Sequence, residues 1–168
     1  MGKAVGKRTW FLSLEEGKWN STPGPDMIMG RYFHGCSSFI FDDELILAVV
    51  GGAAIETSSY TNYTTNFNEF LSYNSPSDGW DNRGTELDLP PDVSMASEAI
   101  LVSNGETLYY VNTRHNVFYI LDHSFHDGFE WIKMDLKLEI PRDFAIGVLI
   151  PDELTNCTKT SIEIKDSD

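Results

Sequence analysis

The clearest structural signal in this amino-acid sequence is RYFHGCSSFIFDDELILAVVGG, residues 31–52. An apolar run at 45–50 ends abruptly at Gly51 and Gly52, and the pair Asp42–Asp43 separates this run from the β-prone residues before it. Aspartates between two such runs are typical of a tight turn. A glycine pair after a strand permits positive φ angles and lets a neighbouring aromatic side chain pack on bare backbone. The stretch therefore predicts a β-hairpin whose second strand ends at Gly51.

The rest of the chain repeats this alternation of short strands and turns. Apolar residues recur with a period of two, and helical periods are nearly absent. Strands are expected at 9–14, 36–41, 45–50, 68–73, 98–103, 107–112, 117–122, 129–134 and 144–150. Turn sequences separate them, and Asn104–Gly105 between two apolar runs is a strong hairpin signal. The sequence therefore predicts an all-β chain built from antiparallel meanders.

Three segments share one pattern that ends in tryptophan. They are WFLSLEEGKW (10–19), EFLSYNSPSDGW (69–80) and VFYILDHSFHDGFEW (117–131). Each runs from aromatic and aliphatic residues through a polar turn with glycine to Trp19, Trp80 or Trp131, and these lie 61 and 51 residues apart. A period of about 50 residues indicates an internal structural repeat.

These features resemble the kelch repeat. The residues that carry the resemblance are Arg31, His34, Gly51, Gly52, Tyr73 and Trp80 in the first full copy, Trp131 in the second and Arg142 in the third. In that family each propeller blade is a four-stranded antiparallel sheet, the glycine pair ends the second strand, and the tryptophan lies at the entry to the fourth. The second copy departs from the pattern, since Asn112–Thr113 replaces the glycines and Met95 replaces the arginine.

The resemblance covers roughly residues 8–157 and implies an incomplete ring. The expected parts are blades at about 31–86 and 94–135, partial blades at 9–20 and 142–150, and a polar C-terminal tail at 158–168. Propellers close with typically 4–8 blades, so even four blades of about 50 residues need about 200 residues. The chain has 168. We therefore expect the C-terminal part of a larger kelch propeller, which would associate with the rest of that propeller.

The composition is that of an acidic globular protein, with 41% hydrophobic residues and a net charge of −14. Such a surface repels phosphate backbones, so nucleic acid binding is not expected. No apolar run approaches the ~18 residues of a membrane span, so membrane insertion is not expected. No signal peptide is visible, which leaves cytoplasmic and secreted locations open. Cys36 and Cys157 are either free thiols or one long-range disulfide.

We find no residue pattern that indicates an enzyme, a cofactor or a metal site. His34 and Cys36 would face the same side of a strand, but no orienting carboxylate or oxyanion hole accompanies them. His123 and His126 lie in a turn, where such residues are ordinary. The segment 74–85 resembles a calcium loop but has no ligand residue at its third position. We therefore expect a non-enzymatic protein that needs no cofactor or metal.

The segment 53–67, AAIETSSYTNYTTNF, resembles a recognition loop. Tyr60 and Tyr63 among Ser, Thr and Asn match the composition of adaptable binding loops, and loops on rigid scaffolds often carry recognition. The expected function is therefore interaction with a protein partner through inter-strand loops. Two alternatives remain open: a solvated insertion without a partner, or a glycan-binding, ligand-binding or galactose-oxidase-like propeller whose active residues lie in other blades. Sequons at Asn62 and Asn156 matter only if the protein is secreted.

Overall fold

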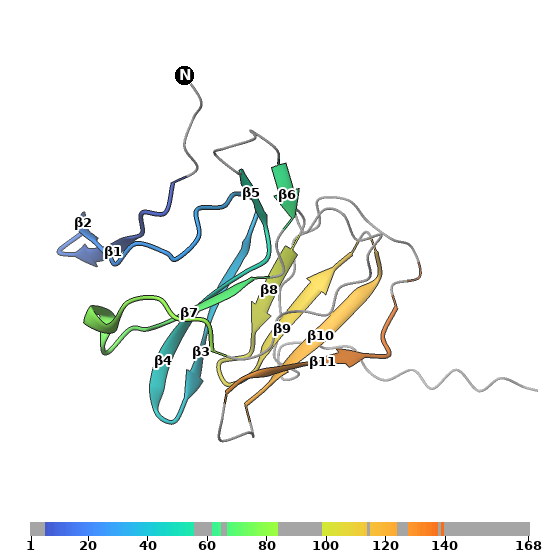
Figure 1. Cartoon of the computed structure of the whole chain (residues 1–168). Helices are drawn as coiled ribbons and strands as arrows, with labels where there is room; N and C mark the ends of the chain where they lie inside the picture. The colour runs from blue at the N-terminus through green and yellow to red at the C-terminus, as the bar shows by residue number, and fades with distance from the viewer. Residues whose placement is uncertain are drawn as a thin grey trace, which may run out of the picture.

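The structure is a computed structural model that describes residues 6–55, 62–64, 67–83, 99–113, 115–123, 128–137 and 139. Within these ranges the chain is all-β, as the period-two patterns predicted, and its paired strands are antiparallel (Figure 1). The only helical element among the described residues is a short 3-10 turn, η1 (Pro76–Asp78). The described strands form sheets of two to four strands and do not close into a ring.

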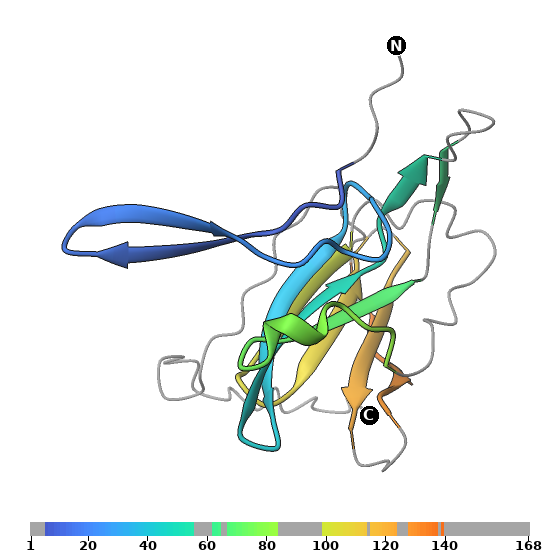
Figure 2. The same ribbon diagram turned by 60° about the vertical axis from the view of Figure 1, so that its left-hand side comes forward.

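The N-terminal part is a two-stranded hairpin that projects from the rest of the molecule (Figure 2). It consists of β1 (Trp10–Glu15) and β2 (Lys18–Pro23), joined by a tight turn in which Glu16 and Gly17 have φ angles of 51° and 74°. Two strands were expected within 9–20, and the second strand continues three residues further than that.

The central sheet contains the hairpin that the opening stretch predicted. Its strands are β3 (Gly35–Phe41), β4 (Glu44–Val50) and β7 (Asn68–Ser72), in that order. Asp42 and Asp43 form the turn with φ angles of 49° and 61°. A single bridge between Phe70 and Asp81 adds one short contact at the free edge of β7. Where a fourth strand was expected, the described residues up to 83 therefore contain one bridging residue.

The connection between β4 and β7 forms a small ribbon of its own. It consists of β5 (Ala53–Ile55) and β6 (Asn62–Thr64), which pair with each other beyond the end of the central sheet (Figure 1). A loop was expected here, and that expectation was wrong for these six residues. Strands of three residues are too short for a period of two to appear in a sequence rich in Ser, Thr and Asn.

The C-terminal described part is a four-stranded meander. Its strands follow one another in space as in sequence: β8 (Ala99–Ser103), β9 (Leu108–Asn112), β10 (Val117–Asp122) and β11 (Glu130–Met134). The predicted turn at Asn104–Gly105 joins β8 to β9, and Gly105 has a φ of 103°. All four strands of this sheet were expected from the sequence, to within one residue at each end.

The central sheet and the β8–β11 sheet pack face to face around the core. The core residues are Phe39, Ile46, Ala48, Val50 and Phe70 from the central sheet, Leu101, Leu108, Tyr110, Val117, Tyr119, Leu121 and Trp131 from the β8–β11 sheet, and Phe129 just before β11. The two sheets are also joined by a hydrogen bond of 2.6 Å from the Ile40 N–H to the Gly105 carbonyl oxygen. The hairpin lies on the opposite side of the central sheet (Figures 1 and 2). The molecule is thus a stack of three antiparallel units in chain order.

Several expectations concern residues outside the described ranges. These are the strand at 144–150, the tail at 158–168, and Tyr60, Arg142, Asn156, Cys157 and His126. The proposed boundaries of the blades remain predictions, because sheets alone do not define a propeller.

Candidate functional site

A buried ion pair lies behind the glycine turn of the central sheet. Arg31 and Glu69 contact each other directly, and neither side chain has exposed surface. The Glu69 carboxylate also accepts hydrogen bonds from the backbone N–H groups of Ile28 at 2.5 Å and Met29 at 3.0 Å. A buried carboxylate is tolerated where a cation and such donors compensate its lost hydration. The pair therefore fixes the segment that enters the central sheet after β2.

The guanidinium of Arg31 also binds the two ends of the β5–β6 connection. It donates to the carbonyl oxygens of Gly51 at 3.2 Å and Phe67 at 2.6 Å. Its central carbon lies 5.4 Å from the centre of the Phe67 ring, within the range of a cation–π contact. One side chain thus holds together the end of β4 and the start of β7, which makes Arg31 a structural residue.

The glycine pair has the backbone that the sequence predicted. Gly51 and Gly52 have φ angles of 67° and 93°. A Cβ atom at Gly52 would lie 2.8 Å from the Tyr32 carbonyl oxygen and 3.0 Å from the Cβ of His34. The neighbour that packs on bare backbone is therefore the chain around Tyr32 rather than an aromatic ring. Tyr32 and Ala53 exchange backbone hydrogen bonds of 2.8 and 2.9 Å at this point.

His34 and Cys36 do not share one environment. His34 is half-buried, and its pKa is lowered, first by burial and then by the charge of Arg31. The backbone at Arg31 and the charge of Glu69 oppose this shift only in part. Cys36 is an exposed free thiol on β3. His34 is thus a neutral neighbour of the buried ion pair at neutral pH.

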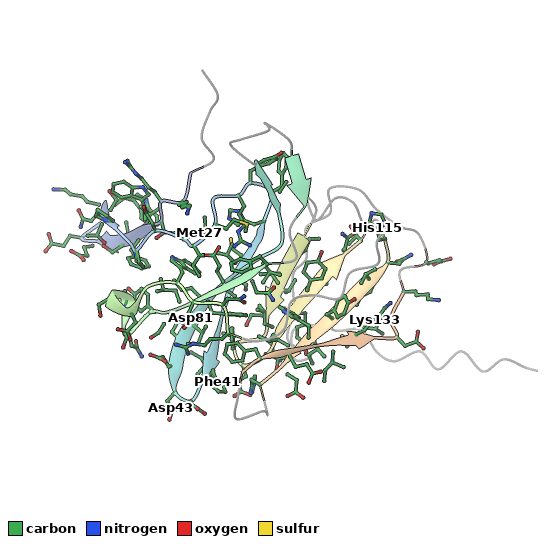
Figure 3. All side chains as sticks on the ribbon, viewed as in Figure 1. Met27, Phe41, Asp43, Asp81, His115 and Lys133 are labelled. Atoms are coloured by element: carbon green, nitrogen blue, oxygen red, sulfur yellow. The ribbon has the colours of Figure 1, made fainter. Side chains whose placement is uncertain are left out.

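Tyr73 and Trp80 attach the N-terminal part to the central sheet. The Tyr73 ring packs edge-on against Phe11 of β1, with 5.6 Å between ring centres. The Trp80 indole N–H donates to the Pro25 carbonyl oxygen at 3.0 Å. Met27, between the hairpin and the central sheet in Figure 3, is 6% exposed. These contacts give both repeat-motif aromatics a role in packing.

Two of the three tryptophans of the repeat, Trp19 and Trp131, occupy equivalent positions in their strand pairs. Each lies across the strand pair from a leucine: Leu14 faces Trp19, and Leu121 faces Trp131. Trp80 lies outside any strand, and the chain next to it is bound to β7 by the single bridge between Asp81 and Phe70. The sequence analysis did not identify these leucines, because the turns that separate them from the tryptophans differ in length. A search that allowed for variable turns would have found them.

One face of the β1–β2 hairpin carries large apolar side chains that are open to solvent. They are Trp10, Leu12, Leu14 and Trp19, which are exposed by 54, 66, 58 and 71%. The antiparallel register puts all four on one face, opposite to the face that bears Phe11. The alternation Trp-x-Leu-x-Leu at 10–14 was the available signal, but the sequence analysis used it only to predict a strand.

The structure describes the expected recognition segment only at its base. Tyr63 lies in β6 opposite Ala54, and Asn62 lies opposite Ile55. The paired strands β5 and β6 lie at one end of the central sheet (Figure 1).

No three His, Cys, Asp or Glu side chains gather as metal ligands in the described part of the chain. Within the same ranges, no helix has the length and apolar character needed to cross a bilayer. No protein-family model matches this chain, and no curated protein matches it.

Proposed function

We propose that the protein is a segment of a kelch-type β-propeller that acts as a non-enzymatic protein-interaction module. The observation that carries this proposal is the leucine–tryptophan pair that recurs at Leu14–Trp19 and Leu121–Trp131. A shared register of this kind is expected in sheets that repeat one structural unit, and it is not expected in unrelated sheets. The packing of the β8–β11 sheet on the central sheet supports the same interpretation, because blades also stack face to face.

Recognition would take place through the segment between β5 and β6, which carries Tyr60, together with Tyr63 of β6. The base of the β5–β6 ribbon is held by the Arg31 guanidinium through the carbonyl oxygens of Gly51 and Phe67. A segment whose two ends are fixed loses less conformational entropy on binding, which favours binding. Tyr60 and Tyr63 would supply contact area and hydrogen bonds to a protein surface.

Site-specific photo-crosslinking tests this function. A photoreactive phenylalanine analogue would replace Tyr60 or Tyr63, and Ser77 in η1 would serve as an exposed control position. In extracts of the producing cells we expect one discrete protein adduct, of fixed stoichiometry, from the ribbon positions alone. Equal labelling from Ser77, or turnover of a small-molecule substrate by the purified chain, would contradict the proposal.

A further inference from the structure

The outer face of the β8–β11 sheet, turned away from the core, carries the acidic pair Asp122–Glu130 at one end and a large apolar area over the rest. The cross-strand register arranges this area in two rows, Ile100–Val111–Phe118–Met134 and Val102–Tyr109–Ile120–Ile132. All eight side chains keep part of their surface in contact with solvent, and Ile132 is 43% exposed. Antiparallel sheets with one solvated face normally alternate apolar with polar residues. A continuous apolar face of this kind marks an interaction surface.

The apolar face of the β1–β2 hairpin lies at the other end of the stack. Figure 3 shows the separation: Met27 marks the hairpin side of the central sheet, and Lys133 on β11 marks the far side. The hairpin and the β8–β11 sheet lie on opposite sides of the central sheet (Figures 1 and 2), so their two open faces do not meet within one molecule.

The internal packing of the chain shows how two such faces fit. The β8–β11 sheet turns the face with Trp131 toward the central sheet, which precedes it in the chain. The central sheet in turn directs Trp80 toward Pro25, on the hairpin side. At each step the face that bears the tryptophan meets the unit before it, and the opposite face meets the unit after it.

This rule leaves one face of each type open among the described residues. The hairpin exposes its tryptophan face, with Trp10 and Trp19, and the β8–β11 sheet exposes the opposite face. Inside the chain, the tryptophan face of one unit packs against the opposite face of the unit before it. The two open faces are therefore of the two types that pack together within the chain. We propose that a second copy of this chain supplies the missing partner face, so that the hairpin of one molecule packs on the β8–β11 sheet of the next.

This inference goes beyond the proposed function. It concerns the open apolar faces of the β1–β2 hairpin and the β8–β11 sheet, and not the segment between β5 and β6. A head-to-tail contact of this kind is heterologous, so it builds a ring if its rotation closes and an open chain if it does not. Two tryptophans and two leucines bury on the order of 500 Å² per partner, which is small for a specific interface. The net charge of −14 also opposes association. We therefore expect weak assembly that strengthens with salt, since salt screens the repulsion.

Sedimentation velocity across about a hundredfold range of protein concentration measures the assembly. The average mass should rise with concentration and with added salt. In parallel, tryptophan emission should shift to shorter wavelength, because Trp10 and Trp19 leave water. Two variants each block one face, Leu14→Lys on the hairpin and Ile132→Lys on β11, both at exposed positions. Ser13→Lys, on the other hairpin face, is the matched control.

Each blocking variant should weaken self-association at least tenfold, while Ser13→Lys should leave it unchanged. The mixture of the two blocking variants is the decisive sample. Leu14→Lys keeps an intact β8–β11 face, and Ile132→Lys keeps an intact hairpin, so the mixture should form dimers and nothing larger. Near-ultraviolet circular dichroism checks that both variants keep the packed core.

A wild-type chain that stays monomeric at every concentration would overturn the proposal. So would association that Leu14→Lys leaves intact, because it would use another surface. A mixture of the blocking variants that fails to associate would exclude the head-to-tail geometry. None of these substitutions lies within residues 53–67. The self-association test and the crosslinking test at Tyr63 can therefore fail independently of each other.

Discussion

Arg31 and Glu69 are 38 residues apart in the sequence and form an ion pair with no exposed surface. Around this pair converge the backbone N–H groups of Ile28 and Met29 and the carbonyl oxygens of Gly51 and Phe67. The pair therefore joins the segment that follows β2 to the neighbouring ends of β4 and β7, which pair with each other in the central sheet. Its role is to fix where the hairpin side, the central sheet and the ribbon meet.

Replacing Arg31 by alanine should destabilise the fold by about 3–5 kcal/mol, because it leaves the Glu69 carboxylate buried without its cation. Urea unfolding monitored by tryptophan fluorescence measures this loss as a lower transition midpoint. Arg83→Ala is the matched control, since Arg83 and Asp81 form an ion pair in which both side chains are more than 40% exposed. The control should change the free energy of unfolding by less than about 1 kcal/mol. Equal effects of the two variants would show that the buried pair is not structural.

Gly52→Ala should destabilise the chain more than Gly105→Ala does. The two glycines have similar φ angles of 93° and 103°, so both substitutions carry the same kind of backbone strain, about 1–3 kcal/mol. Only at Gly52 would the new Cβ also collide, at 2.8 Å from the Tyr32 carbonyl oxygen; at Gly105 no atom lies within 4 Å. Thermal unfolding of both variants measures the difference. If the melting temperatures of the two variants fall equally, the close contact between Gly52 and the Tyr32 carbonyl oxygen does not contribute to the destabilisation.

Most strands could be predicted from the sequence because their signals are local. The hairpin of β3 and β4 follows from apolar runs on both sides of Asp42–Asp43, and the positive φ of Gly51 follows from the need to end β4 there. The turn at Asn104–Gly105 is equally local. Each of these features depends only on residues that are neighbours in the chain, and period and turn chemistry report such neighbours well.

The candidate site could be predicted only in part, because its contacts are long-range. Arg31 was identified as a motif residue, but Glu69 was not, since a glutamate in an alternating strand is normally expected to face water. Its burial depends on Ile28 and Met29, some 40 residues earlier. The exposed face of the hairpin was also not predicted, because its apolar residues were expected to be buried. Leu12 and Leu14 have the pattern of a buried strand, and the sequence does not show that the described chain leaves them uncovered.

Phe129→Ala should weaken the packing between the two sheets and lower the free energy of unfolding more than a substitution at the surface does. The Phe129 ring lies 5.6 Å from Phe39, 5.2 Å from Phe41 and 4.8 Å from Phe70, so it is the aromatic link between the central sheet and β11. Removing a buried phenylalanine typically lowers the free energy of unfolding by about 3–5 kcal/mol. Ile132→Ala, on the outer face of β11, should change it by about 0.5 kcal/mol or less. Urea titration of both variants measures this difference. A similar unfolding midpoint for both would contradict the proposed role of Phe129.

Tyr110 should make the fold sensitive to alkaline pH. Burial raises the pKa of its hydroxyl to about 12; the nearby Asn112 side chain opposes the shift, and Tyr119 adds to it. An unfolded chain ionises this group near pH 10, so the stabilisation is complete below about pH 10 and is lost as the pH rises toward 12. Two pKa units correspond to about 3 kcal/mol.

Tyr110→Phe keeps the ring and removes this titration, so it isolates the effect from the remaining tyrosines. Urea midpoints of the wild type and the variant should be compared between about pH 8 and about pH 11. The midpoint of the wild type should fall more steeply above pH 10 than that of Tyr110→Phe. If the two curves stay parallel over this range, the Tyr110 hydroxyl reaches water in the native state and the core between the sheets is looser than the packing of Tyr110 on Tyr119 and Trp131 indicates.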